Sequence, residues 1–197
     1  MRPVTPSARR ARRRERTSPP LHQIRRRSGK LRCLYAPGVE RSIVGFSQDD
    51  AGDWVAALDC FHRQHVRHDP PFRSAPWVLD QAARSGRVGA ALDCPLCERA
   101  ELPDDLVVAR TTDWFDEETM PPGLRRAHRV AQGTWGRLRV DSGRVRFRAK
   151  THPIIDVVVG PAAPQAIPPG VEHEAEPLGP VRFRVEFLRP RDDRQVT

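Results

Sequence analysis

The sequence is poor in long apolar runs and in aromatic residues. No stretch reaches the roughly 18 consecutive apolar residues that cross a bilayer, and the N-terminus lacks the apolar segment of a signal peptide. Aromatic residues make up 6% and apolar residues 38% of the 197 residues. These shortages exclude a membrane-spanning protein and a large core. We therefore expect a cytoplasmic protein of one domain or two small ones, with no membrane partner.

Acidic residues are nearly absent from residues 1–38, which hold 12 Lys or Arg and a single Glu. This segment has no hydrophobic periodicity, so we predict a disordered basic tail, or a wrongly assigned start with the true one near Val39. Beyond it, 22 basic and 24 acidic residues nearly cancel, although the whole chain carries a formal charge of +9. Nucleic-acid binding is therefore expected only through the tail.

Residues 42–58 predict a β-hairpin. Two segments, Ile43–Phe46 and Asp53–Leu58, flank the turn-forming sequence Asp49-Asp50-Ala51-Gly52. If the second strand continues through Cys60 and His62, its period of two places both side chains on one face. A short helix is expected at 76–84, because Pro lies near its start and Gly follows its end.

Cysteine is scarce, and four cysteines in a cytosolic chain argue for metal binding or free thiols over disulfides. The pair Cys94-x-x-Cys97 has the spacing of half a tetrahedral zinc site, because a tight turn can direct both thiolates at one ion. We predict Cys60 and His62 as the other ligands. His65 or His68 could replace His62 as the fourth ligand. The competing interpretation is a set of free thiols beside a polar histidine loop.

Residues 43–102 are similar to a small bacterial family of unknown function. The matching segments are Asp53-Trp54, Leu58-Asp59-Cys60, 64–71, Pro76-Trp77-Val78 and 92–97. The resemblance implies a domain boundary and a metal site, but it supplies no reaction. A domain of about 60 residues has a marginal core, so a bound metal would contribute much to its stability.

The sequence of the second half of the chain predicts a series of short strands. They are expected at 133–140, 144–149, 154–159 and 181–188. Asp141-Ser142-Gly143 is predicted as a hairpin turn between the first two, and a short helical turn is expected at 124–129. Many short strands with Gly- and Pro-rich turns favour a β-sandwich or barrel. The predicted fold class is therefore mainly β, or α+β overall.

A histidine lies between a rigid turn and a strand in the spacing Pro168-x-Gly170-x-x-His173, which reproduces the core of the second cupin motif. Together with Trp135-Gly136-Arg137-Leu138 and residues 177–183, this makes the segment from about Leu106 to Pro190 resemble the TehB/YeaR-like cupin family, which is linked to tellurite resistance. The resemblance implies a cupin-like β-barrel. We therefore predict that the chain divides into four parts: a tail at 1–38, domains at 39–102 and 106–190, and a tail at 191–197.

Cupins usually hold a divalent metal with histidines and a carboxylate inside the barrel. His173 matches the second-motif histidine, and His128 matches a family histidine. The candidate carboxylate is Glu176, with Glu174 and Glu186 as alternatives. The chain departs from the cupin pattern because it has no His-x-His pair near His128 and has Gly136 where Glu is expected. Strict alternation also places Glu174 and Glu176 opposite His173, so a bend would be needed. The competing interpretation is a buried histidine with solvated glutamates.

Seven arginines alternate with apolar residues on the predicted strands. They are Arg137, Arg139, Arg144, Arg146, Arg148, Arg182 and Arg184. If they share a face, they could bind a small anionic ligand such as an oxyanion. The simpler interpretation is the solvated side of a sheet.

The leading hypothesis is a two-domain bacterial protein that binds zinc in its N-terminal module, with a divalent metal in the cupin, and acts in tellurite or toxic-anion stress. Related TehB-type proteins resemble methyltransferases in a further domain. This sequence has no Gly-x-Gly-x-x-Gly loop, so methylation is not carried over. The alternatives are a metal-dependent cupin enzyme of unknown substrate and a nucleic-acid-binding regulator. A homodimer is a further expectation, because barrels with exposed strand edges often pair.

Overall fold

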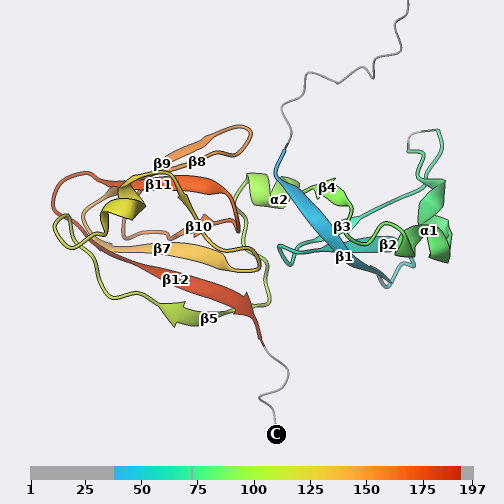
Figure 1. The fold of residues 1–197 in the computed structure, drawn as a ribbon, viewed down its shortest axis with the longest axis horizontal. Helices are drawn as coiled ribbons and strands as arrows, with labels where there is room; N and C mark the ends of the chain where they lie inside the picture. The colour runs from blue at the N-terminus through green and yellow to red at the C-terminus, as the bar shows by residue number, and fades with distance from the viewer. Residues whose placement is uncertain (1–37, 72, 192–197) are drawn as a thin grey trace, which may run out of the picture. The chain divides into compact units, whose positions relative to one another are not determined.

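The computed structural model describes residues 38–71 and 73–191. The predicted basic tail at 1–38 and the tail at 191–197 therefore lie outside the described residues, except for Gly38 and Arg191. The elements are β1 Glu40–Gln48, β2 Trp54–Leu58, β3 Arg63–His65, η1 Pro76–Leu79, α1 Gln81–Ser85, β4 Ala91–Asp93, α2 Pro95–Glu98, β5 Leu106–Thr111, η2 Pro122–Arg125, β6 His128–Arg129, β7 Trp135–Ser142, β8 Val145–Ala149, β9 Ile155–Val159, β10 Gln165–Ile167, β11 Glu172–Pro177 and β12 Arg182–Pro190. The described residues are mainly β, as predicted, and form three four-stranded antiparallel sheets (Figure 1).

The first sheet has the strand order β3-β2-β1-β4 and contains the predicted hairpin. The pairing of β1 with β2 begins with Gln48 opposite Trp54. In the turn between them, Asp49 Oδ1 accepts hydrogen bonds from the backbone N–H groups of Ala51 and Asp53. Such side-chain capping is why aspartate favours turns. β4 pairs with the other edge of β1, which places α2 beside the start of β1.

The helix predicted at 76–84 is divided into two pieces. η1 ends before Asp80, which is extended, and α1 begins after it. Asp80 Oδ1 accepts the N–H of Ala83 at 2.6 Å and so caps α1. The prediction of one helix was wrong because an aspartate whose side chain accepts a backbone N–H three residues ahead favours a helix start over a helix interior.

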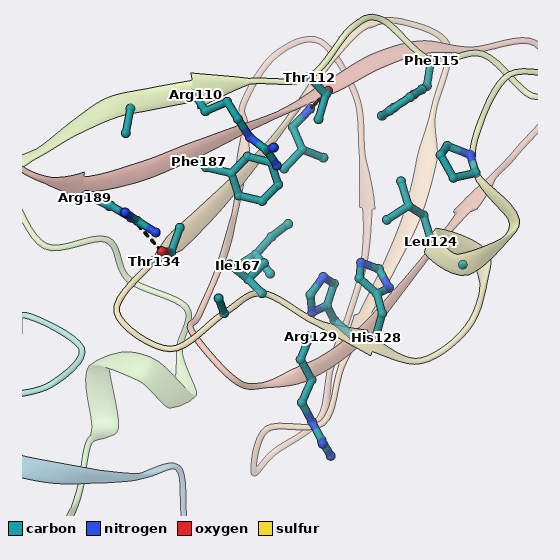
Figure 2. A pocket seen from close by; sticks show the side chains of 17 residues that line it. Arg110, Thr112, Phe115, Leu124, His128, Arg129, Thr134, Ile167, Phe187 and Arg189 are labelled. Carbon is teal, nitrogen blue, oxygen red and sulfur yellow. Dashed lines mark hydrogen bonds between the residues drawn. The ribbon is translucent and has the colours of Figure 1, made fainter.

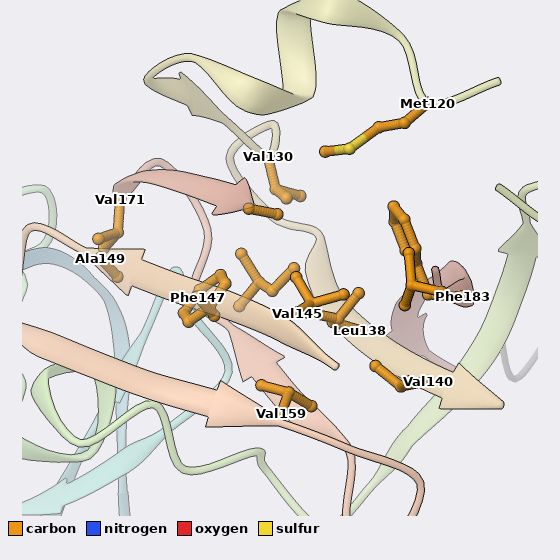
Figure 3. Packing of buried hydrophobic residues seen from close by; sticks show 13 residues of the cluster. Met120, Val130, Leu138, Val140, Val145, Phe147, Ala149, Val159, Val171 and Phe183 are labelled. Carbon is orange, nitrogen blue, oxygen red and sulfur yellow. The ribbon is translucent and has the colours of Figure 1, made fainter. Parts of the chain in front are cut away.

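The main core lies between the other two sheets, with strand orders β10-β7-β12-β5 and β6-β11-β8-β9 (Figure 3). β8 shows the alternation clearly, because Val145, Phe147 and Ala149 are buried while the arginines between them are partly exposed. Leu138 and Val140 of β7 and Phe183 of β12 meet them from the facing sheet. One apolar face on each strand therefore produces a two-sheet core.

The hairpin predicted around Asp141-Ser142-Gly143 was wrong, because β7 pairs with β10 and β12 whereas β8 pairs with β11 and β9. The chain instead passes from one sheet to the other at this turn. Gly143 has φ +75°, and a Cβ there would lie 2.2 Å from the Pro180 carbonyl oxygen. Glycine is required at this corner because both the dihedral angle and the close backbone approach exclude a side chain.

Several other boundaries differ from the prediction. The helical turn expected at 124–129 lies at η2, and His128 already belongs to β6, which pairs with β11. β5, which was not predicted as a strand, pairs with the edge of β12. Short strands such as β6 and β10 carry too few residues for a visible period of two.

The described residues lie within one compact unit, Ala36–Thr197. A second core cluster combines Leu58 and Cys60 with Trp135 and Leu188, and so draws on both sides of residues 102–106. The division into domains at 39–102 and 106–190 stays a prediction. Among the described residues, no helix combines the length and apolar character that crossing a bilayer requires.

Candidate functional site

Four predicted ligands come together at the ends of two local elements. β2 ends at Leu58, and the chain then turns at Phe61, whose φ of +71° is rare for a residue other than glycine. This turn, rather than the continued strand that was predicted, brings Cys60 and His62 to one place. Cys94 and Cys97 lie at the N-cap and within α2. All four residues are buried.

The distances in this Cys/His centre fit a tetrahedral metal ion. His62 Nδ1 lies 3.5, 3.3 and 3.6 Å from the Sγ atoms of Cys60, Cys94 and Cys97, and the sulfurs of Cys60 and Cys94 are 3.8 Å apart. Metal–sulfur bonds of about 2.3 Å and metal–nitrogen bonds of about 2.0 Å give roughly 3.8 Å and 3.5 Å across a tetrahedron. The four atoms all lie within 4.8 Å of one another, so the centre could hold one ion.

The outer contacts of the histidine set its tautomer. His62 Nε2 lies 3.0 Å from the Glu101 carbonyl oxygen, which can only accept, so Nε2 carries the hydrogen. Nδ1 is then free to direct its lone pair at the three sulfurs, which is the usual arrangement of a metal-bound imidazole. The Trp135 indole donates to the Cys60 carbonyl at 2.9 Å and contacts the His62 ring edge to face at 5.4 Å.

A buried arginine supplies a positive charge beside the centre. Arg41 Nε donates to Cys97 Sγ at 3.2 Å, and its Nη2 donates to the Pro169 carbonyl at 2.7 Å. No carboxylate pairs with Arg41 in the described part of the chain, and the residue is only 4% exposed. Sequence reasoning missed Arg41. The available signal was its position two residues before Ile43, which places it on the apolar face of β1.

The thiols and the imidazole already interact without a metal. Hydrogen bonds with Cys60 and Cys97 lower the pKa of the Cys94 thiol, whereas hydrogen bonds with Cys60 and Cys94 together with burial raise the pKa of the Cys97 thiol. Burial lowers the pKa of His62, but hydrogen bonds to Cys60 and Cys94 outweigh it and raise the pKa to about 9. The centre therefore favours a thiolate beside an imidazolium, and a metal would displace the remaining protons.

The alternative histidine ligands lie elsewhere. His65 Nε2 lies 2.7 Å from Asp49 Oδ2 on the surface, and His68 Nδ1 accepts the N–H of Ala75. His65, Asp49 and Asp53 form a second group of donor atoms, but this group is partly exposed and includes a carboxylate already bonded to Arg67. The structure thus brings His62, and neither alternative, to the three cysteines.

His128 and His173 both line a cavity of about 860 Å³, and Figure 2 shows His128 among its lining residues. They are cross-strand partners on β6 and β11, with ring centroids 4.1 Å apart. Each Nδ1 lies close to a backbone carbonyl, at 3.0 Å for His128 and 2.9 Å for His173, so each Nδ1 carries the hydrogen. Both Nε2 atoms remain acceptors.

None of the three candidate glutamates joins this histidine pair. On β11, His173 and Ala175 are buried, while Glu174 lies on the opposite face and pairs with Arg148 at 2.6 Å. Glu176 lies on that outer face as well and is 4.0 Å from Arg148. The bend that a Glu176 ligand would need is absent from β11, which continues in regular register along β8.

Glu186 is also directed away from the cavity. It is buried on the outer side of its sheet, where Arg137 and Arg184 bind its carboxylate at 2.7 and 3.2 Å. Gly136, where a cupin would have glutamate, is closely packed, because a Cβ there would lie 3.0 Å from the Ile167 side chain and would require it to shift. A three-ligand cupin metal site is therefore not assembled by the predicted residues.

The arginine stripe is divided between two sheets and is largely paired. Arg146 bonds Asp156 on one sheet, and Arg182 bonds Asp141 on the other. The stripe thus forms two solvated outer faces, as the simpler interpretation expected, and not one anion-binding face. His152 follows β8, is exposed and precedes a cis proline, and Trp135 is fully buried in the core.

His173 is expected to make the protein sensitive to acid. Burial, assisted by the neighbouring His128, lowers its pKa from 6.5 to about 4. The unfolded state therefore binds more protons between these pH values, so stability is complete above pH 6.5 and falls by roughly 3 kcal/mol as the pH drops to about 4. Urea unfolding of His173→Asn across this range should show a smaller loss than the parent, whereas His65→Asn should keep the full loss.

Two family models match separate parts of the chain. The model described as a protein of unknown function, DUF3565, matches residues 44–101, and the model described as a TehB-like domain matches residues 110–185. These matches support the TehB-like resemblance of the second half and the resemblance of the first half to a family of unknown function. The cupin assignment stays a prediction. No curated protein matches the chain.

Similar solved structures include TehB from Haemophilus influenzae, at 21% identity and a TM-score of 0.41. That similarity covers 44% of this chain and 32% of the TehB chain, so the chain spans about a third of TehB. A protein from Escherichia coli strain K12 is similar at 19% identity and a TM-score of 0.41, over 46% of this chain and 97% of its own.

Proposed function

We propose that this chain is a cytoplasmic zinc-binding protein that acts in tolerance of tellurite or related toxic anions. The observation that carries the metal-binding role is the Cys/His centre of Cys60, His62, Cys94 and Cys97, whose donor atoms are buried and spaced as a tetrahedron requires. The resistance role is supported by the TehB-like match over residues 110–185 together with the family association.

Zinc is favoured over other metals by donor type and by charge. Three thiolates and one imidazole in a closed, buried set are typical of structural zinc. A divalent ion with three thiolates and a neutral histidine leaves one net negative charge, and buried Arg41 supplies one positive charge at 3.2 Å from Cys97 Sγ. Buried charges are stable when paired, so the arginine matches a loaded centre.

The two-domain division and the cupin classification belong to the same proposal. Residues 39–102 would form a zinc module, and residues 106–190 a cupin-like barrel whose cavity contains His128 and His173. These histidines supply two ligands without a carboxylate, so the residues present do not fit a standard cupin metal. We therefore favour a binding role for the cavity over the metal-dependent enzyme.

The proposal is tested by metal content and by tellurite tolerance in the same set of proteins. Elemental mass spectrometry of protein purified without chelator or affinity metal should find one zinc per chain, which Cys94→Ser/Cys97→Ser loses. A tellurite-sensitive bacterial host that expresses the chain should tolerate several-fold more tellurite than one expressing the double variant. His65→Ala is the matched control and should keep both properties. Zinc without any gain in tolerance would sink the resistance role alone.

A further inference from the structure

The cavity above the histidine pair has an unbalanced charge. Of the described residues that line it, none is acidic and three are arginines. Arg129 pairs with Glu172 at 2.9 Å and points away from the cavity in Figure 2. Arg110 and Arg189 make no ion pair in the described part of the chain, so two positive charges at the cavity lack an anion.

These two arginines are held in place by neutral neighbours. Arg110 is the cross-strand partner of Phe187, and its guanidinium lies 4.6 Å from the centre of that ring. Arg189 Nε donates to the Thr134 hydroxyl at 3.0 Å. Phe187 and Arg189 lie on the same face of β12 and line the cavity, while Leu188 between them is buried on the other face. The register shift at this point falls on β5, where the adjacent residues Ala109 and Arg110 both line the cavity. Guanidinium groups fixed in this way are well suited to bind a carboxylate or sulfonate.

The body of the cavity is apolar. Phe115, Leu124, Ile167 and Val185 line it together with Phe187. Figure 2 shows Ile167 and Phe187 between the arginines and His128. A volume of about 860 Å³ lies within the range of sites for small organic molecules, which are mostly apolar with a few polar groups that fix orientation.

The histidine end requires a hydrogen-bond donor. His128 and His173 donate from Nδ1 to the carbonyls of Arg126 and Val171, so in the neutral rings both Nε2 atoms accept. An acceptor on an apolar surface is stable when it finds a donor. An anionic oxygen would be repelled there, which restricts the anion to the arginine end.

We propose that this cavity binds an organic anion with a rigid apolar body, whose carboxylate or sulfonate meets Arg110 and Arg189 and whose hydroxyl donates to the histidine pair. The inference rests on the proposed binding role of the cavity and is independent of the zinc centre. Binding of inorganic oxyanions alone would not use the apolar walls. The chemical class that fits all three regions is therefore an aromatic or alicyclic hydroxy acid.

Three matched probes test the proposal by isothermal titration calorimetry on zinc-loaded protein at neutral pH. 2-Naphthoate is expected to bind about 10- to 100-fold more tightly than neutral 2-naphthamide, because a charge-assisted hydrogen bond is lost in the amide. 6-Hydroxy-2-naphthoate is expected to bind a further 3- to 10-fold more tightly, or roughly the effect of one neutral hydrogen bond.

Variants test which residues bind the anionic group of the ligand and which bind its hydroxyl. Arg110→Met and Arg189→Met should each weaken 2-naphthoate by about tenfold, whereas Arg144→Met removes the same charge from an exposed position outside the cavity and should change nothing. His128→Leu should remove the gain from the hydroxyl, so that 6-hydroxy-2-naphthoate and 2-naphthoate bind with similar affinity. Equal affinities for 2-naphthoate and 2-naphthamide, equal losses in all three arginine variants, or no binding of either naphthoate would overturn the proposal. A hydroxyl without effect would overturn the histidine assignment. Metal content of the same samples separates these failures from failure of the zinc function.

Discussion

Replacing Cys94 and Cys97 together by serine is expected to abolish metal binding at the Cys/His centre and to destabilise the protein by roughly 5 kcal/mol or more. The ion would join the turn after β2 to α2, two segments that are separated by the long connection through β3, η1 and α1. That connection contributes little to the core, because Val78 is its only buried apolar residue among those described between His65 and Ala91. Without the ion, the buried side chains of Cys60 and His62 also lose their common partner.

Thermal unfolding followed by circular dichroism would measure this effect. For a chain of this size a loss of 5 kcal/mol lowers Tm by roughly 10–20 °C. Excess chelator should lower the Tm of the parent by a similar amount and leave the double variant unchanged. His62→Ala should resemble the double variant, whereas His65→Ala should resemble the parent. A parent protein whose Tm ignores chelator would falsify the structural role of the metal.

Local sequence signals predicted the first hairpin and the four side chains that lie together in the Cys/His centre. Asp49 and Gly52 define a turn by their own chemistry, and two half-sites of cysteine and histidine restrict the ligands to a few combinations. The choice of His62 over His65 and His68 could not be settled from spacing. It depends on the left-handed conformation of Phe61, which folds the chain back sooner than a continued strand would.

The pairing of strands that lie far apart along the chain could not be predicted from the sequence. Asp141-Ser142-Gly143 has the composition of a hairpin turn, yet β7 and β8 belong to different sheets because each has other partners. A two-residue period shows which residues share a face, but it does not show which strand lies opposite. The same limit applies to Arg110 and Arg189, which reach one cavity from β5 and β12.

The two-residue period of a strand did predict on which face the candidate glutamates lie. It predicted that Glu174 and Glu176 would lie opposite His173, and the burial of His173 and Ala175 on β11 confirms that alternation. The expected ligand Glu176 required a bend, and β11 has none. A resemblance to a motif family therefore identified the histidines, while elementary strand geometry was the better guide to their neighbours.

The second large loss of stability is expected on replacement of Arg41. Replacement by methionine keeps most of the apolar volume but removes the donors to Cys97 Sγ and to the Pro169 carbonyl. Removing one partner of a buried charge pair typically costs about 3–5 kcal/mol, because the other charge is left uncompensated. Contacts behind a metal ligand also matter for the ion itself, so zinc affinity should fall by about 10- to 100-fold. Urea unfolding and competition with a zinc chelator would measure the two losses.

Two variants control for packing and for charge in general. Arg41→Lys keeps the positive charge but cannot donate in two directions from a planar group, so its stability should lie between those of the parent and Arg41→Met. Arg67→Met removes an exposed arginine that pairs with Asp53, and such a surface pair contributes at most about 1 kcal/mol. Equal losses for Arg67→Met and Arg41→Met would contradict a special role for the buried residue.

A double-mutant cycle then identifies what Arg41 neutralises. If its partner is the negative charge of a metal–thiolate centre, Arg41→Met should cost much less in a Cys97→Ser background, because that centre can no longer form. If its main contribution is instead the hydrogen bond to Pro169, the cost should be the same in both backgrounds. The first result would show that Arg41 acts mainly on the charge of the metal–thiolate centre, while its bond to Pro169 holds the guanidinium against the turn at Pro168–Gly170, which leads into the strand that carries His173. The second leaves the centre and that turn as independent neighbours in one core.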